Sequence, residues 1–163
     1  MKNIALVAHD GRKKELIDWV TYNMNVLQNH NLYATGTTGK LIQEIKRDLL
    51  YGGGEGVYRS QFDYPLKNKV TCLKSGPLGG DQQIGAMIAE GKIDVLIFFC
   101  DNLIVQGHQN DVSALTRLAS LYNIAFATNR TTADMILTSP LLNDDTYKRI
   151  IPDVISAYQN RKL

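Results

Sequence analysis

Five short apolar runs without polar alternation constrain the fold more than any other feature of this sequence. They lie at Ile4–Ala8, Leu32–Ala34, Val70–Leu73, Asp94–Phe99 and Ile124–Ala127. Continuous runs of this length are typical of strands buried on both faces. Amphipathic stretches with helical spacing separate them: Lys13–Leu27, Thr38–Leu50, Asp81–Glu90, Val112–Tyr122 and Thr131–Leu137. This alternation predicts an α/β fold in which helices cover both faces of a parallel sheet.

Length and composition favour a single domain. The chain has 163 residues, of which 44% are hydrophobic, and residues 1–163 are expected to fold as one unit without disulfides or structural metal. The two cysteines, Cys72 and Cys100, predict reduced thiols in a cytoplasmic protein. The apolar stretch at the N-terminus is too short for a secretory signal, and no later run approaches the roughly 20 residues of a membrane span.

The charge balance narrows the classes of partner. Lys and Arg number 18 against 16 Asp and Glu, a formal net charge of +2. Such a small excess excludes charge-driven binding to nucleic acid or to an anionic membrane. Any anion site must therefore be built from local groups.

Two segments do not follow the regular alternation. Leu49–Lys69 joins a predicted helix to a predicted strand and holds several glycines and aromatic residues. Connections in α/β units usually take about 2 to 6 residues, so we expect a mobile insertion here, at the sheet edge opposite the functional loops. Thr146–Gln159 is predicted to be helical, with Pro152 starting or kinking the helix.

Polar residues gather immediately after the predicted strands, where ligands bind in open parallel sheets. They are His9, Asp10 and Lys13 after the first strand, Thr35, Thr37 and Thr38 after the second, Ser75, Gly76 and Asp81 after the third, and Asp101, His108 and Asp111 after the fourth. We expect these twelve residues to meet at one edge of the sheet.

Thr35–Gly39 places glycines and hydroxyls at a strand-to-helix turn, where backbone N–H groups and the helix dipole favour an anion. Ser75–Gly80 repeats this composition, and Lys13 could supply the cation for a phosphate. The sequence contains neither a Walker loop nor a Gly-x-Gly-x-x-Gly at a strand end. The structural alternative is that Thr35 only caps a helix.

The aspartates could also be helix caps, since an Asp before a helix is usually an N-cap. Asp81 and Asp111 both fit that role. Four acids with His9 and His108 at one edge fit it poorly. His30 precedes a strand at the other edge and is expected to be a solvated turn residue. Metal binding is a weaker alternative, since no His-x-x-x-His or Cys-x-x-Cys spacing occurs.

Carboxylates and a histidine beside a phosphate site suit proton abstraction next to the carbonyl of a small phosphorylated sugar. A carboxylate removes the carbon-bound proton while a neutral imidazole polarises the carbonyl oxygen. This chemistry requires no cofactor.

Several blocks of the sequence together resemble the methylglyoxal synthase family. They are Val7–Asp10, Leu32–Gly39, Ser75–Gln83 and Gly91–Phe99, followed by Asp101, His108 and Asp111. The match runs in order over nearly the whole chain. The resemblance implies a doubly wound, flavodoxin- or Rossmann-like three-layer sandwich with five parallel strands, and Leu49–Lys69 stands out as longer than the family's usual turn.

The resemblance also implies an activity, the conversion of dihydroxyacetone phosphate to methylglyoxal and inorganic phosphate by a homohexameric lyase that phosphate inhibits. Asp81 would be the general base and His108 the acid acting on the substrate oxygens, and the surrounding active-site groups would be His9, Asp10, Asp101 and Asp111. The phosphate would be held by Lys13, Thr35, Thr37, Thr38, Ser75 and Gly76.

A second hypothesis comes from another class of protein. The same fold also serves as a regulatory module that binds a phosphorylated or nucleotide effector without catalysis. Such a module would need the phosphate loops but not the acids and histidines, so their joint presence favours the enzyme.

Overall fold

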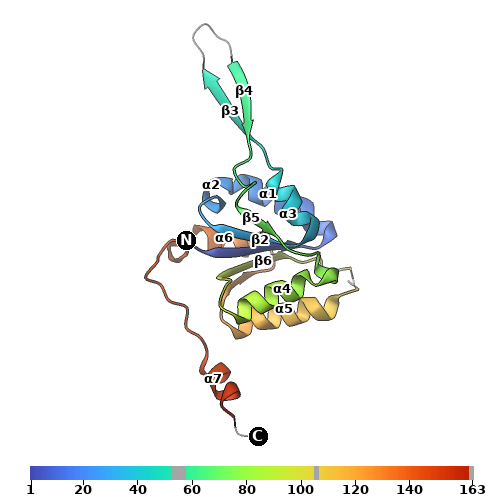
Figure 1. Ribbon diagram of the computed structural model, residues 1–163, viewed down its shortest axis with the longest axis vertical. Helices are drawn as coiled ribbons and strands as arrows, with labels where there is room; N and C mark the ends of the chain where they lie inside the picture. Colours follow the sequence, from blue (N-terminus) through green and yellow to red (C-terminus); the bar gives the residue numbers. More distant parts are fainter. Residues whose placement is uncertain (53–57, 105–106, 162–163) are drawn as a thin grey trace.

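The five apolar runs form one parallel sheet in the computed structural model (Figure 1). It describes residues 1–52, 58–104 and 107–161, with only the backbone for residues 48–52 and 58–62. The strands of this sheet are β1 (Asn3–Ala8), β2 (Asn31–Ala34), β5 (Val70–Cys72), β6 (Val95–Phe99) and β7 (Ala125–Ala127). Their order is β5-β2-β1-β6-β7, and every pair is parallel. The predicted sheet is thus confirmed.

Helices cover both faces of this sheet. One face carries α1 (Lys13–Tyr22), α2 (Met24–Leu27), α3 (Gly36–Gln43) and α6 (Arg130–Thr138), and the other carries α4 (Gly80–Ala89) and α5 (Gln109–Leu121). Alternate side chains of β1 point to opposite faces of the sheet. Leu6 packs in the core beneath α1, α2, α3 and α6, and Val7 packs in the core beneath α4 and α5. The doubly wound three-layer sandwich is therefore confirmed.

The strand order creates a switch point between β1 and β6. The chain winds outward from β1 to β2 and β5, then returns to β6 on the other side of β1 and continues to β7. Loops that leave β1 and β6 consequently diverge to opposite faces and leave a crevice at the carboxyl ends of these strands. This crevice is where the predicted functional loops end.

Three predicted helix boundaries were wrong. The helix expected over Lys13–Leu27 breaks at Asn23, whose side-chain amide donates to the carbonyl of Trp19 over 3.0 Å and competes with the helical hydrogen bonds. The helix expected over Thr38–Leu50 ends at Gln43. The C-terminal helix α7 covers only Asp153–Gln159, and Pro152 precedes it as the N-cap.

The long connection contains an antiparallel hairpin that projects from the body of the molecule (Figure 1). It consists of β3 (Arg47–Gly52) and β4 (Tyr58–Asp63), with Arg47 paired to Asp63 at its base through an ion pair of 2.7 Å. Gly53, Gly54, Glu55 and Gly56 lie outside the described residues. The segment also contributes Leu66 to the core, where that side chain is fully buried.

His30 lies at the amino end of β2. It was expected to be solvated, but it is buried, and its Nδ1 accepts the backbone N–H of Lys2 over 3.2 Å. This contact joins residues 28 apart in sequence, so a local pattern does not signal it.

Short 3-10 turns complete the described part of the chain: η1 (Asp10–Arg12), η2 (Gly76–Leu78) and η3 (Pro140–Leu142). In the described part of the chain, no helix is long and apolar enough to cross a membrane.

Candidate active site

A cavity of about 820 Å³ occupies the crevice at the switch point. Its lining combines the first turn of four helices with the ends of β1 and β6. The lining residues are Val7, His9, Asp10, Lys13, Thr35, Gly36, Thr37, Thr38, Ser75, Gly76, Pro77, Asp81, Phe98, Gly107, His108, Asn110 and Asp111.

The fold brings all but one of the predicted site residues to this cavity. The exception is Asp101, whose carboxylate turns back to accept the backbone N–H of Leu103 over 3.2 Å. Six lining residues were not predicted: Val7, Gly36, Pro77, Phe98, Gly107 and Asn110. Val7 and Phe98 belong to apolar strands, so their sequence pattern signals core packing and gives no sign of a site.

Asp81 and His108 form a buried pair at the centre of the cavity. The Nδ1 atom of His108 lies 2.9 Å from Oδ2 of Asp81, and the aspartate side chain is only 1% exposed. The other carboxylate oxygen, Oδ1, is buried and has no hydrogen-bond partner among the residues that the structure describes. Burial raises the pKa of Asp81, with a smaller contribution from the negative charge of Asp111, while hydrogen bonding and charge from His108 oppose that rise. A desolvated carboxylate with one free oxygen is suited to act as a base.

Neither Asp81 nor Asp111 is a helix N-cap. The N-cap of α4 is Gly79, in the left-handed region at φ 101°, and the N-cap of α5 is His108. No side-chain capping bond occurs at either helix start. Asp81 lies in the first turn of α4 and directs its carboxylate to His108, which removes the structural alternative for this residue.

His9 is held as a neutral donor toward the cavity. Its Nδ1 accepts the backbone N–H of Asp101 over 2.9 Å, so the ring proton resides on Nε2 in the neutral form. That Nε2 is buried, and no described residue is its hydrogen-bond partner. The edge-on ring of Phe98, with its centroid 5.0 Å away, fixes the imidazole plane. Burial, followed by the nearby His108, lowers the pKa of His9 and favours this neutral form.

Asp101 therefore acts on the site through its backbone. It lies two residues after the end of β6, and its N–H reaches His9, which follows the neighbouring strand β1. We assign Asp101 as a positioning residue, since its side chain does not line the cavity.

The second set of groups surrounds the start of α3. Within the described part of the chain, the N-cap Thr35 makes no side-chain capping bond, and the buried hydroxyl of Thr38 has no hydrogen-bond partner. The ammonium of Lys13 lies 2.6 Å from both the Thr37 hydroxyl and the Asp10 carboxylate. The proximity of Lys13 lowers the pKa of Asp10. Unused hydroxyls, a cation and a helix start together form a site for a dianion.

Two glycines let the loops approach this closely. Gly36 has φ 48°, and a Cβ there would come 2.5 Å from the Ser75 hydroxyl. A Cβ on Gly76 would come 3.0 Å from both carboxylate oxygens of Asp81 and 3.1 Å from a ring carbon of His108. The absence of a side chain at Gly76 thus leaves room beside the carboxylate for a substrate.

A metal centre is not favoured by this geometry. Among residues 1–52, 58–104 and 107–161, no three or more His, Cys, Asp or Glu side chains are grouped in a way that could hold a metal ion. The Asp81–His108 pair and the anion site are arranged for proton transfer next to a bound phosphate.

Comparison with known proteins agrees with this geometry. Residues 52–128 match the family model described as MGS-like domain. The methylglyoxal synthase of Maridesulfovibrio salexigens is 50% identical over 163 residues, an alignment that covers 100% of this chain and 98% of that relative. This chain belongs to the methylglyoxal synthase family.

Further family members give the same result. The methylglyoxal synthase of Pseudoalteromonas atlantica is 49% identical over 93% of this chain and 98% of its own length. The crystal structure of methylglyoxal synthase from Elizabethkingia anophelis matches with a TM-score of 0.79 at 43% identity, covering 99% of this chain and 92% of that one. The family predicted from the sequence motifs is confirmed.

Proposed function

We propose that this protein is a lyase that converts dihydroxyacetone phosphate to methylglyoxal and inorganic phosphate. The observation that carries the proposal is the buried Asp81 carboxylate, which has one oxygen on His108 and the other unpartnered, in the same cavity as the anion site of Lys13 and α3. Membership of the methylglyoxal synthase family supports the same reaction.

In the first step, the substrate phosphate lies among Lys13 and the hydroxyls of Thr35, Thr37, Thr38 and Ser75. Asp81 then takes a proton from the hydroxymethyl carbon, and the electrons of that C–H bond form a double bond to the carbonyl carbon. The carbonyl oxygen gains the negative charge. His9 donates to it through Nε2–H, and His108 moves protons on the substrate oxygens.

In the second step, His108 takes the proton of the hydroxyl on the former hydroxymethyl carbon, and that oxygen becomes the aldehyde oxygen. The double bond shifts to the phosphate-bearing carbon, and the C–O bond to phosphate breaks. Phosphate leaves into the anion site, and the remaining enol loses its hydroxyl proton and gains a proton on its terminal carbon to become methylglyoxal. Elimination requires the C–O bond to stand perpendicular to the plane of the ene-diolate, because only then do the π electrons overlap with it. Holding the phosphate through several groups fixes that rotamer.

The regulatory effector-binding module remains the second candidate from the same fold. Such a module would bind its effector through Lys13 and the residues at the start of α3. The Asp81–His108 pair would then have no function. Incubation with dihydroxyacetone phosphate, followed by assays for both methylglyoxal and released phosphate, separates the two. Equal amounts of the two products support the lyase, and tight phosphate binding without turnover supports the module.

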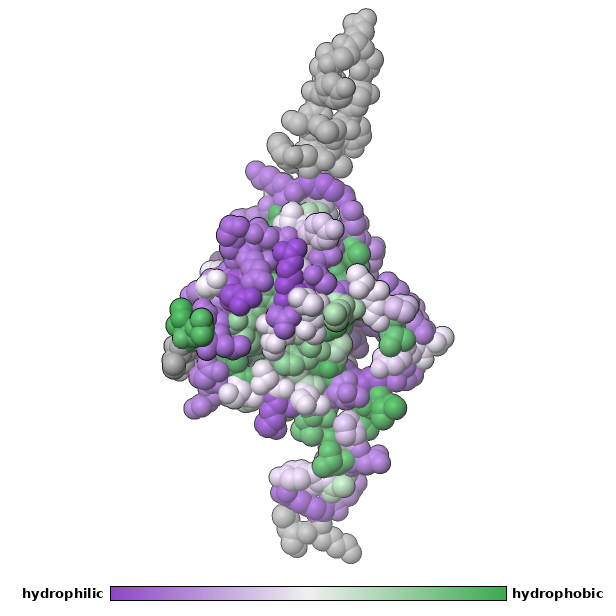
Figure 2. Space-filling view, turned by 180° about the vertical axis from the view of Figure 1, so that it is seen from behind, coloured by the Kyte–Doolittle hydropathy of each residue, from purple (hydrophilic) through white to green (hydrophobic). Residues whose placement is uncertain are grey.

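We also propose a cytoplasmic homohexamer inhibited by inorganic phosphate, consistent with the two unpaired cysteines in the described part of the chain. Outer strand β5 exposes Thr71 and Cys72, and helix α7 buries none of its residues. Figure 2 shows hydrophobic side chains along the C-terminal segment, where Ile150 is 78% exposed. These surfaces favour contact with further copies of the chain. Size-exclusion chromatography with light scattering, with and without phosphate, tests the assembly.

A further inference from the structure

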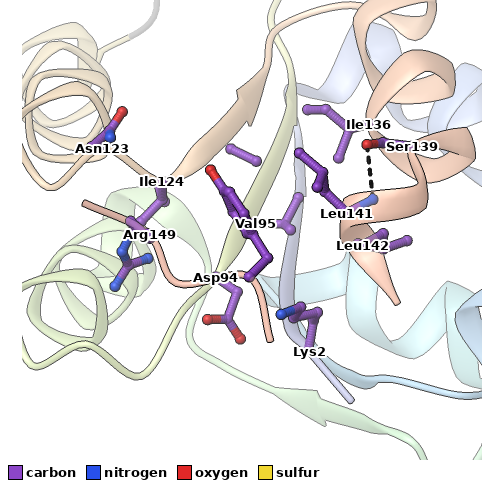
Figure 3. A pocket seen from close by; sticks show the side chains of 12 residues that line it. Lys2, Asp94, Val95, Asn123, Ile124, Ile136, Ser139, Leu141, Leu142 and Arg149 are labelled. Carbon is purple, nitrogen blue, oxygen red and sulfur yellow. Dashed lines mark hydrogen bonds between the residues drawn. The ribbon is translucent and has the colours of Figure 1, made fainter. Parts of the chain in front are cut away.

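A second cavity (Figure 3) lies at the amino ends of the strands, whereas the active-site cavity lies at their carboxyl ends. Its volume is about 280 Å³, and it is bounded by the starts of β1, β6 and β7 and by residues 139–149. Its lining residues are Lys2, Asp94, Val95, Asn123, Ile124, Ala125, Ile136, Ser139, Leu141, Leu142, Tyr147 and Arg149. None of them lines the active-site cavity.

The C-terminal segment 139–150 is held in place as one wall of this cavity. Four polar contacts link it to the amino ends of the strands: the Met1 α-amino group to Asp145 at 3.2 Å, Lys2 Nζ to the Asp144 carbonyl at 3.4 Å, the Asn123 amide to the Ile150 carbonyl at 3.0 Å, and Arg149 to the Ile93 carbonyl at 3.0 Å. Because these contacts are distributed along segment 139–150, they fix it against the sheet and thereby fix the wall of the cavity.

The interior of the cavity is apolar. Val95, Ile124 and Leu142 are buried, and Ile136 packs against the core beside them. Tyr147 is 48% exposed and adds an aromatic ring to the lining. Small-molecule sites usually measure roughly 300 to 1,000 Å³, so this volume suits a ligand no larger than a single ring with a short substituent.

The charged side chains that line the cavity determine which ligand charge it favours. Lys2 and Arg149 each give one hydrogen bond to a backbone carbonyl, which leaves further donors on the ammonium and the guanidinium. The lining contains one carboxylate, Asp94, which already accepts the backbone N–H of Asn3 over 2.9 Å. Asp144 and Asp145, outside the lining, lie beside Lys2 and the Met1 amino group, so Arg149 is the cation that carries the proposal. Its guanidinium matches the planar geometry of a carboxylate, and an anionic ligand is therefore favoured.

We propose that this cavity binds a small carboxylate with an apolar, ring-sized body. The carboxylate contacts Arg149, and the body packs on Val95, Ile124 and Leu142. The ligand joins the C-terminal segment to the sheet, so its binding stabilises the folded chain. Active-site residues lie at the other edge of the sheet, and turnover does not depend on this cavity.

Benzoate is a suitable probe for this site. Isothermal titration and thermal unfolding of the full chain should give saturable binding and a rise in melting temperature. Saturating inorganic phosphate should leave the benzoate affinity unchanged. Displacement by phosphate would place benzoate in the active site and overturn the proposal, as would the absence of saturable binding by the wild-type protein.

Two variants test the geometry. Arg149→Gln should weaken benzoate binding about ten- to a hundredfold, the effect of losing a charged hydrogen bond, and Ala125→Phe should block the cavity while retaining both cations. Arg130→Gln removes the same charge from helix α6 outside the cavity and serves as the matched control. Equal affinity in the wild type and in either cavity variant would refute the site, even where the variant has a lower melting temperature.

Discussion

His108 Nδ1 lies 2.9 Å from Asp81 Oδ2, whereas Oδ1 of the same buried carboxylate has no hydrogen-bond partner in the described structure. One residue lies in the first turn of α4 and the other caps α5, and the pairing forms because the two helices pack side by side on one face of the sheet. The contact with His108 therefore orients the carboxylate through Oδ2 and leaves Oδ1 to accept a proton from a substrate.

Replacement of the proposed base should affect turnover far more than binding. Asp81→Asn keeps the shape but cannot accept a proton, so kcat should fall by about 10² to 10⁴ while phosphate affinity stays near that of the wild type. Steady-state kinetics and phosphate titration check this. Asp18→Asn, on the exposed face of α1, is the control. An Asp81→Asn enzyme retaining more than about a tenth of wild-type kcat would contradict the assignment.

The pH profile should reflect the environments of Asp81 and His9. Burial raises the pKa of Asp81, so the carboxylate becomes protonated, and the base is lost, at a higher pH than for an ordinary Asp near about 3.9. The lowered pKa of His9 keeps this ring neutral below its usual value of about 6.5. The acid limb of kcat/KM should thus lie above pH 4. A limb at or below about pH 4 would show that Asp81 is not the titrating base.

The anion site can be tested with two neighbouring lysines. Lys13 contacts Thr37 and Asp10 in the cavity, whereas Lys14 pairs with Asp18 on the surface. Lys13→Gln should raise the KM for dihydroxyacetone phosphate about ten- to a hundredfold and reduce thermal stabilisation by phosphate. Lys14→Gln should change neither. Equal effects of the two substitutions would argue that only net charge matters.

The hairpin should be dispensable for catalysis. Arg47 and Asp63 are paired in register, so a short Gly-Asn turn can replace Arg47–Asp63 while Leu66 stays in the core. Extending the deletion to Asn68 would remove Leu66 and destabilise the fold. We expect kcat to be unchanged. If the hairpin packs between subunits, light scattering will give a smaller assembly, whereas an intact assembly without turnover would place the hairpin in the catalytic site.

Folding stability should decline in mild acid because of His30. Burial, with the Met1 amino group and Lys2 nearby, lowers the pKa of His30 in the folded state. Between that pKa and about 6.5, the unfolded chain binds more protons. The stabilisation is thus fully present above pH 6.5 and decreases as the pH falls. Urea unfolding of the wild type and His30→Gln across this range measures it, and parallel pH dependences would exclude His30 as the cause.

The local sequence determined the sheet, its helical layers and the composition of the site. Continuous apolar runs can be buried only as central strands, and the parallel arrangement brings the ends of all five to one edge, where Asp81, His108 and the α3 loop were expected. These features follow from residues close together in the chain.

Contacts between distant residues decided the rest. Asp81 looks like an N-cap in sequence, and only the packing of α4 against α5 directs it to His108. The side chain of Asp101 was predicted to join the site, but its backbone N–H is the group that reaches His9, because β6 pairs with β1 in a register that no local pattern encodes. His30 is likewise buried with a contact to Lys2, which is distant in sequence, and the second cavity forms where the two ends of the chain meet across the sheet. Neither contact is specified by one segment alone.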